Sequence, residues 1–432
     1  MTLIKYKLGE IANIEISGVD KKCVTGETSV RLCNFVDVYR TWAITSEMAE
    51  KFMKATARQT EIEKFTIRKG QVALTKDSET RDDIGISTYI ADNFDDVVLG
   101  YHNALVTPNP KVLNGKYLNA LLHTDYAKKY FANNASGSGQ RYSLSVDSLN
   151  DFPLPLPSLK EQEKIGNIFS SIDRKILLNR AINQNLEALA KQLYDYWFVQ
   201  FDFPDEKGKP YKSSGGKMVW NERLKRIIPA DWEVKPLFEA AHIQYGFPFA
   251  TELFTEDITN VPIVRIRDII EGTISAYSFE KIDEKYRLSE GDVLVGMDGN
   301  FHINYWHNNI AYLNQRCVRI RPHTQSSISS AQILYSITPH IKAKEQNAKG
   351  STVGHLSDKD IKGLFILSPK ATCKFNPKET MDCILHRIIS NKQQLILLTK
   401  QRDELLPLLM NGQVSVNSDL AYNHTFTKST KQ

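Results

Sequence analysis

Histidines and cysteines are the residues of this 432-residue chain that could bind a metal or act as nucleophiles. His302 and His307 flank aromatic residues in the segment FHINYWHNN, but a zinc site needs at least a third protein ligand, and none is obvious nearby. The cysteines form no CxxC pair and no cluster with histidine, so we expect reduced and mostly buried thiols. They are Cys23, Cys33, Cys317, Cys373 and Cys383. The sequence predicts neither a metal site nor a bound cofactor.

Motifs of nucleotide-dependent enzymes are also missing. Segment 215–218 (GGKM) lacks the upstream glycine and the hydroxyl of the phosphate-binding loop GxxxxGK[ST]. Segment 137–140 (GSGQ) lies in a polar stretch and is a weak match to a dinucleotide-binding motif. An adenine methyltransferase would need a cofactor-binding glycine motif and an Asn/Asp-Pro-Pro-aromatic tetrapeptide, and neither is present. The sequence therefore predicts no catalytic residue, and it favours a binding protein over an enzyme that acts alone.

Composition and charge are those of a globular protein. Hydrophobic residues make up 41% of the chain and charged residues 24%, and the length predicts two or three domains. No apolar run approaches the roughly 20 residues that cross a bilayer, and the first ten residues do not resemble a signal peptide. We therefore expect a cytoplasmic protein without membrane association. The net charge of +5 is compatible with a polyanionic partner but does not require one.

The chain contains an internal repeat. Segments 65–77 (FTIRKGQVALTKD) and 286–298 (YRLSEGDVLVGMD) share an aromatic residue, an apolar residue, Gly, Val and Asp in the same register. Each predicts a polar turn at the glycine followed by a short buried strand. Further matches follow in the same order: 99–108 with 313–322, each a strand ended by Pro, 137–157 with 350–369, and more weakly 8–14 with 237–243. Four matches in one order indicate two copies of one half-unit.

A long helix is predicted after each copy, with about 35–40 residues or roughly 55–60 Å. The first begins after Ser158, which forms a capping box with Glu161. The second begins after Asn376, with Pro377 at the first helical position, and Gly412 is a predicted C-terminal stop. The predicted apolar seams are Ile165, Ile168, Ile172, Ile176, Leu186, Leu189, Leu193 and Trp197, and then Met381, Ile384, Ile388, Leu395, Leu398, Leu405 and Leu409.

Long helices with a narrow apolar stripe favour pairing as a coiled coil, and the alternative is two separate helices in two domain cores. Asn179 and Asn183 interrupt the first seam, and Asn391 and Arg402 occupy seam positions in the second. Buried amides would fix the register of the pair. Alternatively, the two asparagines of the first helix face water where the helices diverge.

The predicted organisation has six parts. The first copy spans 1–157 and a long helix 158–200, and a connector follows at 201–233. The second copy spans 234–371, the second long helix spans 374–412, and a flexible polar tail spans 413–432. The connector is rich in Lys, Pro, Ser and Gly, so we expect little regular structure beyond a short turn around 221–226.

Several segments resemble the specificity (S) subunit of type I restriction–modification enzymes. Segment 154–165 (LPLPSLKEQEKI) is similar to the hallmark (I/L)PLPxLxEQxxI of that family. The similarity continues through 178–183 (LNRAIN), 196–198 (YWF), 201–204 (FDFP), 208–216 (GKPYKSSGG) and 228–234 (IPADWEV), and it covers essentially the whole chain. The second copy departs from the hallmark, because 366–373 reads ILSPKATC, without the second Pro and the Glu-Gln pair.

The resemblance implies an α+β fold with two α/β target recognition domains, separated by two long antiparallel helices that form a coiled coil, in a pseudo-twofold internal repeat. It implies a non-catalytic subunit that binds a bipartite, asymmetric site in double-stranded DNA, with the helices as a ruler for the spacer. The implied partners are modification (methyltransferase) subunits, two in number, and ATP-dependent restriction subunits. The departure in the second copy bears on whether both docking surfaces for modification subunits are equivalent. The alternative is a solitary DNA-binding regulator or anti-restriction decoy of the same fold.

A DNA-reading role directs attention to polar loops, because Lys and Arg contacts to phosphates give affinity and a few side chains at base edges give specificity. The candidates are Lys76, Arg81, Gln140, Arg141 and Tyr142 in the first domain, and Asn300, His302, Asn304, Trp306, Ser351 and Thr352 in the second. For each one, an ordinary surface role is the alternative. Strand-like stretches hold Arg265, Arg267, Arg319 and Arg321, a pattern that favours one exposed sheet face over DNA contact.

Overall fold

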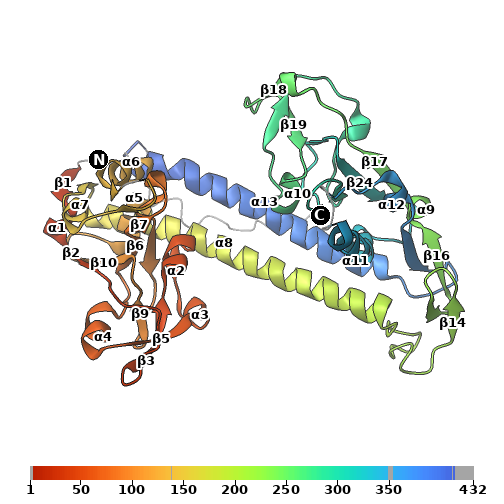
Figure 1. The fold of residues 1–432 in the computed structure, drawn as a ribbon, viewed down its shortest axis with the longest axis horizontal. Coiled ribbons are helices and arrows are strands. Elements are labelled where there is room, and N and C mark those ends of the chain that lie inside the picture. The colour runs from red at the N-terminus through yellow and green to blue at the C-terminus, as the bar shows by residue number, and fades with distance from the viewer. Residues whose placement is uncertain (1–2, 138, 349–353, 411, 414–432) are drawn as a thin grey trace, which may run out of the picture. The chain divides into compact units, whose positions relative to one another are not determined.

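A computed structural model describes residues 3–137, 139–348, 354–410 and 412–413 (Figure 1). The chain divides into two compact units, one formed by residues up to Leu177 together with residues from Leu397 onward, the other by Leu178–Ile396. The predicted flexible tail lies outside the described residues, except for Gln413.

The first unit contains a five-stranded sheet of order β2-β10-β6-β8-β4 and a three-stranded sheet of order β5-β3-β9. Successive residues of the central strand face opposite sides. Val72 and Leu74 pack in a core with the helices, and Ala73 packs in a second core with the three-stranded sheet. The strands are β1 (Ile4–Lys7), β2 (Ala12–Ile16), β3 (Thr28–Cys33), β4 (Ala43–Ile44), β5 (Met53–Ala57), β6 (Val72–Thr75), β7 (Asp77–Ser78), β8 (Ser87–Ile90), β9 (Val97–Leu99), β10 (Asn103–Pro108), β11 (Ser136–Gly137), β12 (Tyr142–Ser143) and β13 (Pro153–Leu156).

Short helices connect these strands and cover the larger sheet. Leu118, Leu121 and Leu122 of α5 pack in the core formed with Val72 and Leu74. The helices of the first copy are α1 (Leu8–Ile11), α2 (Phe35–Arg40), α3 (Ser46–Ala49), α4 (Gln59–Phe65), the 3₁₀ turn η1 (Arg81–Asp83), α5 (Gly115–Leu122), α6 (Asp125–Asn134) and α7 (Val146–Asn150).

The second unit repeats this arrangement and confirms the internal repeat. Its main sheet has the order β17-β24-β21-β22, which corresponds to β2-β10-β6-β8, and a second sheet has the order β18-β20-β19-β23. The parallel pair of β3 with β9 has its counterpart in β19 with β23. The strands are β14 (Met218–Asn221), β15 (Arg226–Pro229), β16 (Trp232–Pro236), β17 (Ala241–Tyr245), β18 (Phe254–Thr255), β19 (Val261–Val264), β20 (Ala276–Ser278), β21 (Val293–Gly296), β22 (Ile303–Tyr305), β23 (Tyr312–Leu313), β24 (Cys317–Pro322) and β25 (Phe365–Pro369).

The repeated glycine turns and strands form as predicted. Gly70 and Gly291 have φ angles of 96° and 81°, a conformation that glycine adopts without strain. The strands that follow them, β6 and β21, are buried along their whole length. The helices of the second copy are α9 (Leu237–Ala240), η3 (Thr251–Leu253), α10 (Asp268–Glu271), η4 (Glu284–Tyr286), α11 (Ser330–Ala348) and α12 (Asp358–Lys362).

Two long helices follow the two copies, α8 (Leu159–Tyr194, 36 residues) and α13 (Pro377–Met410, 34 residues). The amide of Glu161 donates to the Ser158 hydroxyl at 3.4 Å, and that hydroxyl donates to the Glu161 carboxylate at 3.0 Å. At the second start, the amide of Lys378 donates to the Asn376 side chain at 3.2 Å. A short π-helix, η2 (Asp195–Val199), continues α8. The predicted starts of both helices are confirmed.

The two helices pair antiparallel within each unit. In the first unit, Ile165 and Phe169 of α8 share a core with Leu406 and Leu409 of α13, beside the recognition domain (Figure 1). In the second unit, Ala190 of α8 shares a core with α13 residues that include Ile384 and Ile388. Among the seam residues, Ile165, Ile176, Trp197, Met381, Ile384, Ile388 and Leu409 are buried, and Ile168, Ile172, Leu186, Leu193, Leu395, Leu398 and Leu405 are half-buried. The helices therefore form a pair and also belong to the domain cores.

Polar groups contribute to the seam. The Asn183 side chain is buried and donates to the backbone carbonyl of Ile388 at 3.1 Å, and the Asn179 amide donates to Gln394 at 3.2 Å. The buried contact of Asn183 favours the register-setting interpretation for that residue, whereas the Asn179 contact lies at an exposed position. The prediction for Leu189 is wrong, because 43% of this residue is exposed and its neighbour Ala190 occupies the seam.

The connector is more ordered than its composition suggested. Its predicted turn joins β14 to β15, and these strands pair as an antiparallel hairpin. Phe201 and Phe203 are buried, and their ring centroids lie 5.9 and 4.9 Å, respectively, from that of Trp232. Phe375 stacks on Phe203, with a centroid distance of 4.8 Å. The expectation of little regular structure was wrong, because these aromatic side chains pack between the end of α8 and the start of α13.

The hallmark segment joins the first recognition domain to α8. Strand β13, with the sequence PLPL, pairs with β1, and the Gln162 side chain is buried. Its carbonyl accepts from the amide of Asn114 at 2.9 Å, and its amide donates to the carbonyls of Val112 and Pro157, each at 3.0 Å. A Cβ at Gly166 would lie 2.9 Å from the backbone nitrogen of Tyr117, so α8 approaches α5 closely.

The Gln162 contacts generate a stability prediction. Gln162→Ala leaves one buried amide and two carbonyls without this partner, and we expect a loss of about 1–3 kcal/mol in the free energy of unfolding of the first unit. Urea unfolding would measure the change. The exposed neighbour Glu163, changed to Ala, is the control, and equal stability of the two variants would contradict the structural role of Gln162.

Candidate nucleic-acid interface

A hollow of about 540 Å³ lies on the first recognition domain, at the ends of β7 and β12. Gln140 and Arg141, two of the predicted DNA-contact residues, line it. Aromatic rings from α2 form part of its wall, with the Phe35 and Tyr39 rings stacked at 5.8 Å. The hollow therefore combines exposed hydrogen-bonding groups with apolar faces, as a site that contacts nucleobases requires.

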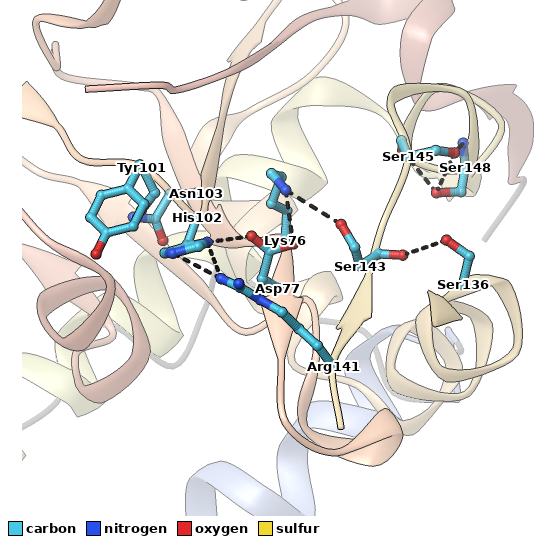
Figure 2. A network of polar contacts seen from close by, with 10 residues as sticks. All are labelled: Lys76, Asp77, Tyr101, His102, Asn103, Ser136, Arg141, Ser143, Ser145 and Ser148. Carbon is cyan, nitrogen blue, oxygen red and sulfur yellow. Dashed lines mark hydrogen bonds and ion pairs between the residues drawn. The ribbon is translucent and has the colours of Figure 1, made fainter. Parts of the chain in front are cut away.

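Asp77 is the centre of a polar network beside this hollow (Figure 2). Its carboxylate lies 2.5 Å from Nδ1 of His102 and 2.8 Å from the ammonium of Lys76. One guanidinium nitrogen of Arg141 lies 3.0 Å from Nδ1 and 2.9 Å from Nε2 of His102, so it faces the imidazole ring. Lys76 also donates to the Ser143 hydroxyl at 3.3 Å. Three loops distant in the sequence meet at one carboxylate.

The network fixes the charge state of Asp77. Burial raises the pKa of the carboxyl, but hydrogen bonds from Lys76, Ser143 and His102 outweigh it and hold the pKa below the ordinary value of 3.8. The carboxylate is therefore ionised at neutral pH and holds the basic groups around it.

The predicted contact residues of the first domain differ in how they are presented. Arg81, Gln140 and Arg141 are exposed, and the Arg81 guanidinium lies 5.1 Å from the Tyr142 ring centroid. Lys76 is turned inward, with 18% of its side chain exposed and its ammonium paired with Asp77. Three of the five are therefore exposed, Tyr142 is half-buried beneath the Arg81 guanidinium, and Lys76 is bound within the Asp77 network.

The second domain has a corresponding network around Asp298. Its carboxylate lies 2.6 Å from Nδ1 of His355 and 3.4 Å from the Arg316 guanidinium. Asn300 is exposed and His302 is half-buried on the loop between β21 and β22. Ser351 and Thr352 lie outside the described residues.

Two candidates of the second domain serve the fold instead. The prediction for Trp306 is wrong, because the residue is fully buried in a core with Val264 and Leu294, and its indole donates to Asn308 at 3.1 Å. The Asn304 amide donates to the carbonyl of Ile270 at 3.2 Å, so it links β22 to α10.

The arginines of the strand-like stretches do not form one exposed sheet face as expected. Arg319 is buried and donates to the carbonyls of Lys285 and Arg287 at 3.1 and 2.7 Å. Arg321 makes two hydrogen bonds to Asp292, at 2.6 and 2.7 Å. Arg265 donates to Ser275, and Arg267 is exposed. Three of the four arginines therefore form hydrogen bonds with residues of their own domain.

Other chemistry-bearing residues are dispersed. Within the described ranges, no three His, Cys, Asp or Glu side chains gather as ligands for a metal ion. Burial and the nearby Lys392 lower the pKa of His307 to about 4. The cysteines are all unpaired, and only Cys33 and Cys317 are buried, so the expectation of mostly buried thiols was wrong. Among the helices that the structure describes, none is long and apolar enough to cross a membrane.

The sequence interpretation missed the groups that organise both networks, namely Asp77, His102, Asp298, Arg316 and His355. Asp77 and Asp298 end the most similar pair of repeated segments, so the repeat itself carried a signal for them. The other three gave none, because their contacts depend on how distant loops meet.

Two copies of one α+β domain, each with exposed basic and amide side chains in its loops, define a two-domain binding protein. The model of the type I restriction modification DNA specificity domain matches the chain twice, over residues 4–188 and 229–394. The chain belongs to this family, and the resemblance inferred from the hallmark segment is confirmed.

Relatives and solved structures agree with this assignment. The chain is 26% identical over 326 residues to the type I restriction enzyme MjaIX specificity subunit of Methanocaldococcus jannaschii, which covers 73% of this chain and 72% of that protein. It is 22% identical over 413 residues to the HindI specificity subunit of Haemophilus influenzae, covering 81% and 88%. A crystal structure of the type I restriction–modification system S subunit from M. genitalium matches with a TM-score of 0.62 and 15% identity over 95% of this chain and 96% of that one, which supports the predicted fold.

The lowered pKa of Asp77 predicts a pH dependence of stability. A carboxylate with a depressed pKa in the folded state contributes stability that is complete above its unfolded pKa and is lost as the pH falls through the folded pKa. We expect Asp77→Asn to destabilise the first unit by about 1–3 kcal/mol at neutral pH. We expect that difference to shrink as the pH falls below the ordinary aspartate pKa of 3.8 and through the lowered pKa of Asp77. Urea unfolding across this range would test it, with the exposed Asp82→Asn as control, and a constant difference would contradict the ion-pair account.

Proposed function

We propose that this chain is the DNA-sequence-recognition subunit of a type I restriction–modification enzyme. Its first domain reads one half of a bipartite DNA site and its second domain reads the other half. The modification subunits methylate the DNA and the restriction subunits cleave it. This chain determines which DNA sequence the complex binds. The proposal extends to this chain the role that the names of its relatives state.

The observation that carries the proposal is one recognition fold present twice with different polar groups at equivalent places. The Asp77 network contains Lys76, Ser143 and His102, and the corresponding network at Asp298 contains Arg316 and His355. Base edges are distinguished by their patterns of donors and acceptors. Two domains with the same fold and different donors are therefore suited to two different half-sites.

The proposal is tested by mapping methylated adenines in the genome of a host with and without this gene. We expect one bipartite motif, two short defined halves with an unspecified spacer, to lose methylation when the gene is deleted. The locus must be shown to be active by complementation with the intact gene. An unchanged methylome in an active locus would contradict the proposed function.

Helix α8 and its continuation η2 carry exposed apolar residues suited to docking a modification subunit. Leu178, Ile182, Leu189 and Tyr196 are 53%, 44%, 43% and 39% exposed, although each is large and apolar or aromatic. The spacings of four and seven residues place Leu178, Ile182 and Leu189 along one face of α8, and Tyr196 follows in η2. Exposed apolar faces of this kind mark contact sites in assemblies.

We expect Ile182→Glu combined with Leu189→Glu to weaken binding of the modification subunit at least about tenfold, because two charges would be buried in the interface. Pull-down and ultracentrifugation of co-expressed subunits would measure the loss. Gln184→Glu, an exposed position on another face of α8, is the matched control. Undiminished assembly of the double variant would contradict docking on this face.

A further inference from the structure

Two of the four non-glycine residues that the structure places in the left-handed backbone region occupy equivalent positions in the two copies. His102 immediately precedes β10 with φ 69°, and Arg316 immediately precedes the corresponding strand β24 with φ 65°. Glycine adopts this conformation readily, whereas most other residues adopt it in only a few per cent of cases. Both copies have a basic side chain at this position.

Backbone hydrogen bonds establish the equivalence. The amide of Lys76 donates to the carbonyl of His102 at 2.9 Å, and the amide of Met297 donates to the carbonyl of Arg316 at 2.8 Å. The next residue along each chain segment is an aspartate, Asp77 or Asp298. The two aspartates therefore occupy equivalent backbone positions, each next to the basic residue with the left-handed conformation.

A third segment contributes to each network at a matched place. The amide of Leu144 donates to the carbonyl of Lys76 at 2.8 Å, and the amide of Leu356 donates to the carbonyl of Met297 at 2.7 Å. The segment that ends at Leu144 supplies Arg141 to the first network, and the segment that ends at Leu356 supplies His355 to the second. Each copy thus brings together one Asp, one His and one Arg. In the first copy the His precedes β10 and the Arg lies in the third segment, and in the second copy the Arg precedes β24 and the His lies in the third segment.

We propose that these two triads, Asp77–His102–Arg141 and Asp298–Arg316–His355, are the base-reading centres of the two recognition domains. In each triad the arginine reads a guanine through its major-groove edge, and the aspartate is a positioning residue that binds the arginine directly, as Asp298 binds Arg316, or through the histidine, as Asp77 does through His102. This inference rests on the proposed function, because it names the base that each domain reads.

The chemistry of the triad favours a base over a phosphate as its ligand. A planar guanidinium donates two parallel hydrogen bonds to O6 and N7 of guanine, the commonest specific contact of arginine with DNA. A neighbouring carboxylate repels phosphate oxygens, so a site that only neutralised the backbone would gain nothing from Asp77 or Asp298. Arg316 and His355 have 59% and 47% of their side chains exposed, and Arg141 is exposed at the edge of the 540 Å³ hollow. Both arginines are thus held in place and open to a partner.

The test uses the full chain in complex with its modification subunits and duplexes that carry the methylated site. Each guanine of the two halves is replaced in turn by 7-deazaguanine, which lacks the N7 acceptor. We expect wild-type binding to fall about tenfold at one guanine in each half. Arg141→Ala should abolish this sensitivity in one half only, and Arg316→Ala in the other half only.

Two further variants separate base reading from other roles. Arg141→Lys keeps the positive charge but lacks the paired N–H donors of the guanidinium. We therefore expect it to lose the sensitivity to 7-deazaguanine, as Arg141→Ala does. Asp77→Asn should reduce the same sensitivity while binding to non-specific DNA is retained, as expected of a positioning residue. Lys51→Ala, an exposed basic position of the same domain, is the control and should leave the sensitivity unchanged.

The outcomes distinguish this inference from the proposed function. Arginine variants that weaken binding to all sequences equally, with a smaller salt dependence, would identify phosphate contacts and overturn the inference. Variants that retain the wild-type response to 7-deazaguanine in both halves would also overturn it. A wild-type complex that methylates no bipartite site would instead contradict the proposed function itself.

Discussion

The antiparallel contact between α8 and α13 is the interaction on which the rest of the structure depends. The core of the first recognition domain is completed by Leu406 and Leu409, which lie more than 200 residues beyond the domain in the sequence. The second unit likewise uses Ala190 of α8 to complete the core formed with Ile384 and Ile388. Each domain is thus held by helices from both copies, and neither copy contains all of its own core. A buried asparagine, Asn183, lies within this contact, where a polar group disfavours slipped alignments.

This arrangement gives a structural meaning to the asymmetry between the two copies. The glutamine of the LPLP…EQ segment is directed inward, where it joins the first domain to the start of α8. The second copy makes its junction with other groups. Lys378 of α13 donates to the carbonyl of Ser326 at 2.6 Å. The loss of the signature in the second copy therefore reflects a different internal junction, and it is no argument against a docking surface there.

Local sequence patterns predicted the turns, strands and helix starts well, because these features depend on residues that are close in the sequence. The glycine turns at Gly70 and Gly291, the buried strands after them and the caps at Ser158 and Asn376 depend on neighbours a few residues away. The errors arose where packing between distant segments determines which side chains are buried. The three- and four-residue spacing of apolar residues predicts Leu189 in the seam, yet Ala190 is buried there instead. Trp306 lies in a segment rich in polar residues, yet it is buried in the domain core. The Asp77 network joins residues 25 to 67 positions apart, so no spacing rule could have revealed it.

Hydrogen exchange on two truncated chains tests the interlocked arrangement most directly. A chain that ends after Ile396 lacks the α13 residues that pack on Ile165 and Phe169, whereas a chain that ends after Gln413 keeps them. The structure predicts that the backbone amides of residues 159–177 lose their protection in the shorter chain and keep it in the longer one. Equal protection in both chains would show that the first recognition domain is complete without α13, and it would contradict the account.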